Sequence, residues 1–228
     1  MKIVYETNGK GVLGWLVDLP GAYIRGRTID EARSKIEQEI TDYENWLGIK
    51  TESDDEYTES VQECNLQVED ADSNILFDTE QIDFKSLDDF EYWCKLVSVS
   101  ATKADNLYKS CQYKDFVDPH MVRKTFYGDV YSTINEQFAH IINVQNYYLA
   151  QIGTGIETGN DLLSSRRGFI EQLRRKYLAE GNRLYKNEEE SWTIKKIARR
   201  IIWHDRIHAK AIGRMEKRKS ADAGTASH

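Results

Sequence analysis

The chain has 228 residues, a net charge of −7 and a negative mean hydropathy, and 30% of its residues are charged. This length allows one large or two small domains with hydrophobic cores, and the lack of any run of 18 apolar residues predicts no membrane-spanning helix. The N-terminus lacks the basic flank and apolar stretch of a signal peptide, and the three cysteines are widely spaced. We therefore expect reduced thiols and a cytoplasmic location.

The charge is divided unevenly along the chain. Residues 1–90 contain 8 Lys and Arg against 22 Asp and Glu, whereas residues 91–228 contain 23 against 16. This asymmetry favours two modules of different character, and the acidic first part makes nucleic acid an unlikely partner for the whole chain. The basic excess in residues 166–219 is typical of solvated helix faces, the alternative being an anion-attracting surface.

Residues 1–27 alternate short apolar runs with turn signals, which predicts three strands. Asn8-Gly9 is typical of a hairpin turn and Pro20-Gly21 of a second turn. A helix should then begin after Thr28, with Glu31 completing a capping box, and end at Gly48. The N-terminal module is therefore predicted to be α+β, in the order β-β-β-α.

The segment that follows is harder to assign. The acidic stretch 51–63 has almost no apolar residues and is predicted to be a loop or linker. Residues 64–70 and 74–80 could each form a short strand, either completing the N-terminal sheet, which we favour, or lying over the next domain. We place the end of the N-terminal module at residue 83.

From residue 86 the pattern changes to long amphipathic helices. The expected helices cover 86–111, 123–152, 161–181 and 191–218, with Ser191 capping the last. Four helices of this length joined by short loops predict an all-α, up-down four-helix bundle over residues 86–217. The small polar tail, 218–228, is expected to be disordered.

Two histidines occupy the apolar face of the last helix. The face repeats at intervals of three and four residues and consists of Ile194, Ile197, Ile201, His204, His208, Ala211 and Met215. Residues four apart lie one above the other on a helix, so the two imidazoles can converge on one point. A buried ring nitrogen needs a partner, and a metal ion would supply one to each ring. The alternative is that both histidines are structural core residues.

A third histidine could complete a metal site. His140 lies at the margin of the apolar face of the second helix, and facing helices meet in a bundle core. Three neutral imidazoles leave coordination positions for water or substrate. His120 and His228 have no partner in the sequence. Tyr147 and Tyr148 are candidates for a pocket wall or, more simply, for the core.

Residues flanking the histidines are not assigned a catalytic role. Asp205 points about 100° away from His204 on the helix, since successive residues turn by that angle. We expect Asp205 to pair with Arg206 or with an arginine of the third helix. The sequence names no general base.

The segments FAHIINVQNYYL and RRIIWHDRIHAKAI resemble the DinB-like superfamily of bacterial four-helix bundles, over about residues 86–217. The matching residues are His140, His204 and His208. The resemblance implies a divalent metal ion on these three histidines, zinc or nickel above all. Characterised relatives include transferases and isomerases that use low-molecular-weight thiols.

The N-terminal module is similar to HicB-like domains, over residues 1–50 and at most to 83. Leu19-Pro20-Gly21, Gly26 and the helix start Thr28–Ala32 match the pattern of that family. In antitoxins of this family the domain binds a toxin, and a DNA-binding domain usually follows it. Here a predicted metal-binding bundle follows instead, which favours an accessory or dimerisation role for this module.

These observations lead to two hypotheses about function. The first is a metal-dependent enzyme, such as a thiol-dependent transferase or a hydrolase, acting on a low-molecular-weight thiol or another small molecule as a homodimer. The second is a non-enzymatic binding or stress-associated protein whose acidic N-terminal module docks a basic protein partner.

Overall fold

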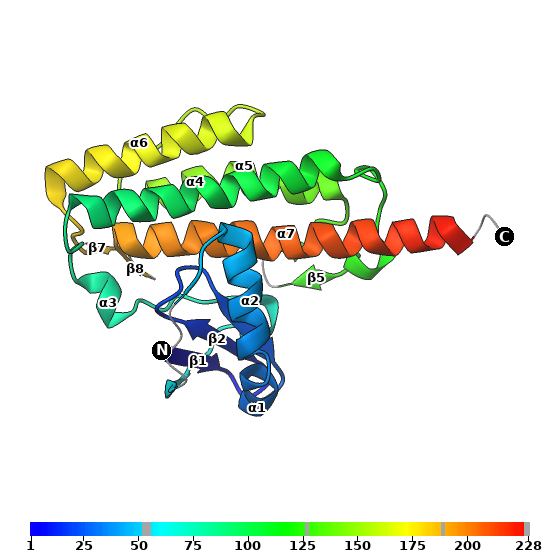
Figure 1. The fold of residues 1–228 in the computed structure, drawn as a ribbon, viewed down its shortest axis with the longest axis horizontal. Coiled ribbons are helices and arrows are strands. Elements are labelled where there is room, and N and C mark those ends of the chain that lie inside the picture. The colour runs from blue at the N-terminus through cyan, green and yellow to red at the C-terminus, as the bar shows by residue number, and fades with distance from the viewer. Residues whose placement is uncertain (52–55, 126–127, 188–189, 226–228) are drawn as a thin grey trace.

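The computed structural model describes residues 1–51, 56–125, 128–187 and 190–225. A four-stranded sheet with two helices forms the N-terminal part, and four long helices lie side by side in the C-terminal part (Figure 1). The structure therefore contains an α+β region followed by a mostly helical region, as predicted. No helix within the described ranges is long and apolar enough to cross a membrane.

The sheet contains the three predicted strands and a fourth. Strands β1 (Lys2–Thr7), β2 (Val12–Leu16), β3 (Tyr23–Gly26) and β4 (Thr58–Glu63) are arranged in the order β3-β2-β1-β4. The first three pair antiparallel, with Ile3 opposite Leu16 and Trp15 opposite Tyr23. β4 pairs parallel with β1 and forms one edge of the sheet.

The position of β4 corrects the sequence interpretation. It lies in the acidic stretch predicted to be a loop, because an edge strand whose six residues are all exposed needs no apolar residues. The two segments predicted as strands have other structures. The first contains the short 3₁₀ helix η1 (Val68–Asp70), and the second ends in α3 (Asp78–Gln81).

The predicted first helix is interrupted and forms α1 (Ile29–Arg33) and α2 (Ile36–Leu47). Its ends are as predicted. The Thr28 hydroxyl accepts a hydrogen bond from the Glu31 amide at 3.2 Å, and Gly48 ends α2 with a φ of 67°. The Glu31 carboxylate accepts from the Arg27 amide instead of closing the box on Thr28.

Both faces of the sheet are buried. Ile3, Tyr5 and Leu16 face α2 and share a core with Ile36, Ile40 and Tyr43. The opposite face packs on the last long helix, through a cluster that contains Val4, Trp15, Tyr23, Val68, Ile75, Phe77 and Trp203. The sheet is therefore docked directly onto the helix that carries two of the three candidate metal ligands.

The four long helices are α4 (Leu87–Ser110), α5 (Ile134–Ala150), α6 (Leu162–Glu180) and α7 (Ile194–Thr225). α4 packs on α6 and α7, and α5 packs on the same two helices from another side. The connections carry the 3₁₀ helix η2 (Pro119–Met121) and two small hairpins, β5 (Lys124–Thr125) with β6 (Gly128–Asp129), and β7 (Tyr185–Lys186) with β8 (Ser191–Trp192).

Two of the predicted helix starts were wrong. α5 begins eleven residues later than predicted, because Thr133 and Glu136 form a reciprocal capping box. Ser191 does not cap α7, since it pairs in β8. The cap is Thr193, whose hydroxyl accepts a hydrogen bond from the Lys196 amide at 3.1 Å.

The end of α7 also differs from the prediction. The helix continues to Thr225, into the tail that was expected to be disordered. The tail contains alanines, which favour helix, and no proline that would stop it. Residues 226–228, which include His228, lie outside the described residues.

Candidate metal centre

The candidate metal centre is built on α7, where histidines replace aliphatic residues on a buried face. Ile194, Ile197 and Ile201 are fully buried on this face, and Ala211 and Met215 continue it toward the C-terminus. His204 is only 7% exposed, and His208 is partly buried. The helical period that fixes the two histidines one turn apart also points both into the contact with α5.

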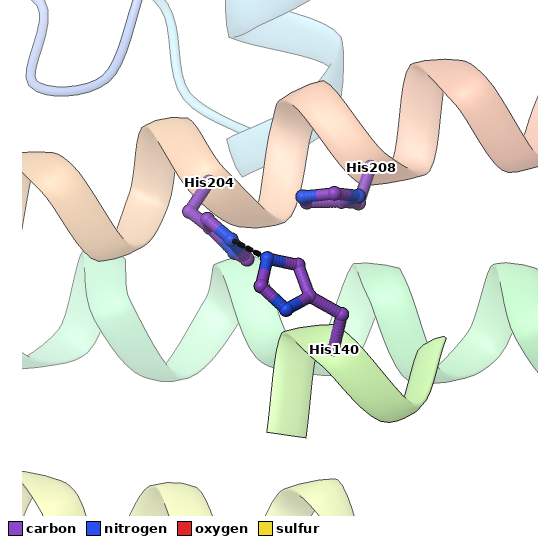
Figure 2. A group of neighbouring side chains, drawn as sticks. All are labelled: His140, His204 and His208. Atoms are coloured by element: carbon purple, nitrogen blue, oxygen red, sulfur yellow. Dashed lines mark hydrogen bonds between the residues drawn. The ribbon is translucent and has the colours of Figure 1, made fainter. Parts of the chain in front are cut away.

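His140 of α5 meets the two histidines of α7. Figure 2 shows its imidazole directed toward α7, close to both rings. Its Nε2 lies 3.0 Å from Nε2 of His204, and the three ring centroids are 4.4 to 4.8 Å apart. One ligand nitrogen from each residue can be chosen so that all three lie within 4.8 Å of one another. The structure therefore brings together the three residues singled out from the sequence.

These distances fit a metal ion. Two nitrogens that each bind an ion at about 2.0–2.1 Å, in tetrahedral or octahedral geometry, are roughly 2.9–3.4 Å apart. The His140 and His204 Nε2 atoms already have this spacing. At least one of the remaining separations, which reach up to 4.8 Å, must shorten when an ion is bound. In the metal-free chain the 3.0 Å contact is a hydrogen bond, which requires a proton on one of the two nitrogens.

Burial keeps the three imidazoles neutral. Removal from water lowers the pKa of His140 to about 4 and that of His208 to about 3. Burial also lowers the pKa of His204 well below its usual value, and the neighbouring histidines lower it further. Because a metal ion binds only the neutral ring, these groups are ready to coordinate at neutral pH.

Gln137 orients one of the rings. Its Oε1 lies 2.5 Å from Nδ1 of His208, and its amide nitrogen donates to the Tyr131 carbonyl at 2.6 Å. Because the second contact fixes the amide, Nδ1 of His208 must carry the proton and donate it to Oε1. Nε2 of His208 is then left with a free lone pair, as a metal ligand requires.

The role of Gln137 was not predicted from the sequence, although its spacing from His140 indicates it. It precedes His140 by three residues and therefore lies on the same face of α5. A polar residue at that spacing, on a helix face that also carries a candidate ligand, indicates a partner for the ligand's other nitrogen.

Aromatic rings surround the histidines. The Tyr131 ring lies on His140 with centroids 4.6 Å apart and is 37% exposed, so it stands between His140 and solvent. Tyr148 is buried, with its ring 6.2 Å from His204. Tyr147 is 53% exposed and contacts Tyr148 and Trp192. Of the two tyrosines considered as a pocket wall, Tyr148 thus lies beside the site.

Asp205 forms the ion pair that the sequence suggested, with an arginine of the third long helix. The Arg166 guanidinium donates to both carboxylate oxygens, at 2.8 and 2.9 Å, and both side chains are buried. Arg166 also donates to Gln145 on α5 and to the Val97 carbonyl on α4. One guanidinium therefore connects all four long helices beside the histidines.

The two ring nitrogens of His204 have different surroundings. Nε2 faces His140, while Nδ1 is buried and has no hydrogen-bond partner among the described residues.

No family model matches the chain, and no curated protein or solved structure is detectably similar to it. The assignment of a metal to these residues therefore rests on their geometry and their neutral state.

Proposed function

We propose that the protein is a metal-dependent enzyme of the DinB-like type, in which α4 to α7 form a four-helix bundle around a divalent ion held by His140, His204 and His208. The observation that carries this proposal is the convergence of three neutral imidazoles from two facing helices. Imidazole ligands suit Zn²⁺ and Ni²⁺, and we propose one of these as the bound ion.

A divalent ion at this position would act as a Lewis acid and lower the pKa of a thiol or water that it binds. The residues of the chain supply the conditions for this chemistry. Gln137 holds His208 in the correct tautomer, and Tyr131 shields His140 from solvent. The ion pair between Arg166 and Asp205 fixes the helices that carry the ligands.

The charge of the site supports a thiol substrate. Three neutral ligands leave the full positive charge of the ion for an anionic group such as a thiolate. The nearest acid in the sequence, Asp205, has both oxygens occupied by Arg166 and is not free to act as a general base. A low-molecular-weight thiol needs little help from a base, because its own pKa is close to neutral once an ion binds it.

Metal analysis of the purified protein tests the first part of the proposal. We expect one divalent ion per chain by mass spectrometry after dialysis, and its loss in His204→Ala and His208→Ala. The matched control is His120→Ala, because His120 is exposed in η2 and does not belong to the group of three. A protein that binds neither Zn²⁺ nor Ni²⁺ in a direct titration would contradict the proposal.

A cobalt-substituted protein tests the second part. The visible spectrum of Co²⁺ reports its ligands, so titration with 2-mercaptoethanol should add a sulfur-to-cobalt charge-transfer band. Co²⁺-loaded protein whose spectrum does not change with the thiol would retain the metal site but rule out thiol binding at it.

A further inference from the structure

A cavity lies between the N-terminal module and α4, and its lining does not include the three histidines. Its volume is about 460 Å³, within the range of small-molecule sites. The β2–β3 turn, α2 and the first turns of α4 form its walls. Most of the lining is apolar or aromatic and includes Leu19, Pro20, Ile40, Ile49, Trp93 and Leu96.

A buried tyrosine forms part of the wall. Tyr43 is fully buried and lines the cavity, yet its hydroxyl has no hydrogen-bond partner among the described residues. An unpaired buried hydroxyl is unfavourable, so such groups are retained where something can bond to them. A ligand that reaches Tyr43 therefore gains from carrying a hydrogen-bonding group at that end.

Two carboxylates line the same cavity. Asp18 lies in the β2–β3 turn and is exposed, and Asp89 lies in the first turn of α4 and is partly buried. Each uses its Oδ2 to accept a backbone amide, from Lys2 at 2.8 Å and from Lys85 at 3.0 Å. Among the described residues, neither Oδ1 atom accepts a hydrogen bond, so both can face a ligand.

The lysine at this cavity is already paired. Lys50 is 86% exposed at its side chain, and its ammonium contacts Glu44 at 2.9 Å. The α-amino group of Met1 donates to the Glu56 carbonyl at 2.9 Å. Tyr92 and Trp93 add aromatic faces, which attract cations as well as apolar groups.

We propose that this cavity binds a small organic amine, with its ammonium group at Asp18 and Asp89, its apolar body against the aromatic and aliphatic wall, and a hydroxyl at the Tyr43 end. The site is separate from the metal centre. Its tests therefore succeed or fail independently of metal binding.

A series of three probes tests the proposal on the full chain by isothermal titration calorimetry. Tyramine carries both an ammonium and a phenol, phenethylamine lacks the hydroxyl, and 3-(4-hydroxyphenyl)propionate carries a carboxylate in place of the amine. We expect tyramine to bind about threefold to tenfold more tightly than phenethylamine, because its hydroxyl can form one additional hydrogen bond, with Tyr43. The propionate should not bind measurably. Failure of both amines to bind, or equal binding of the propionate, would overturn the proposal.

Variants of the wall locate the binding. Tyr43→Phe should remove the preference for tyramine over phenethylamine while leaving phenethylamine affinity unchanged, and it should raise the free energy of unfolding, since the buried hydroxyl has no protein partner among the described residues. Asp89→Asn should weaken both amines by about tenfold, and Asp88→Asn, the exposed neighbour that does not line the cavity, should weaken neither. A tyramine preference that survives Tyr43→Phe would show that the amine binds elsewhere and would overturn the assignment.

Discussion

The Arg166 guanidinium donates two hydrogen bonds, of 2.8 and 2.9 Å, to the carboxylate of Asp205, and both side chains are buried. Asp205 directly follows the metal-ligand candidate His204, so this pair fixes the rotation of α7 at the site. Because both of its carboxylate oxygens accept hydrogen bonds from Arg166, Asp205 stabilises the helix packing and is not available as a general base.

Removal of Arg166 should destabilise the protein strongly. Arg166→Met leaves the Asp205 carboxylate buried and uncompensated, and we expect a loss of about 3–5 kcal/mol in the free energy of unfolding. Urea denaturation measures it. The control is Arg175→Met on the same helix, where an exposed pair with Glu171 at 3.3 Å should contribute less than about 1 kcal/mol. Equal losses in the two variants would contradict the assignment.

Gln137 should control metal affinity without being a ligand. Gln137→Leu keeps the volume of the side chain but leaves the Nδ1 proton of His208 without an acceptor, which typically weakens metal binding by about 10–100-fold. Competition with a chromophoric chelator measures the change. Gln137→Glu retains an acceptor for His208 and should recover most of the affinity, whereas an unchanged affinity in Gln137→Leu would show that the contact has no role.

The metal-free protein should lose stability as the pH falls below about 6.5. The pKa of His140 is lowered to about 4 in the folded chain, while the unfolded chain keeps a value near 6.5. Between these values the unfolded state binds more protons, so stability is full above about pH 6.5 and declines as the pH falls toward 4.

A histidine variant isolates this contribution from that of the carboxylates. The free energy of unfolding of chelator-treated protein, measured by urea titration from pH 7.5 to 4.5, should fall less steeply in His140→Gln than in the original chain. Parallel pH profiles would mean that His140 does not titrate differently in the two states.

The turn at Gly21 should be intolerant of any side chain. Gly21 has a φ of 87°, and a Cβ atom there would lie 2.6 Å from Ile202 and 2.8 Å from the backbone nitrogen of Trp203 on α7. Gly21→Ala should therefore cost about 1–3 kcal/mol in backbone strain and a similar amount from the clash. Gly9→Ala provides the control, because Gly9 has a φ of 80° but nothing within 4 Å of a new Cβ.

The comparison of these two glycines separates strain from docking. A melting temperature lowered much more by Gly21→Ala than by Gly9→Ala would support direct contact between the turn and α7. Equal shifts in melting temperature would contradict the close contact between the Gly21 turn and α7.

Local features of the fold could be read from the sequence alone. Thr28 caps its helix as predicted, Ser86 and Asp161 cap helices that were predicted to begin at these residues, and Gly48 and Gly181 end helices in positive-φ conformations. These signals act within a few residues, because a capping side chain bonds the amide two or three positions away. The placement of His204 and His208 on one face is equally local, since it follows from the helical period.

Which helices and strands contact one another is decided only by the tertiary structure. The pairing of β4 with β1 joins segments more than fifty residues apart. The residues of β4 are exposed and show no apolar alternation that would predict a strand. The contact of His140 with His204, and of Gln137 with His208, likewise depends on how α5 packs against α7. The sequence determined which side chains share a helix face, because the backbone period sets that. Which faces come together depends on the burial of whole helices and of the sheet, and it was that packing which brought three histidines from two helices to one point.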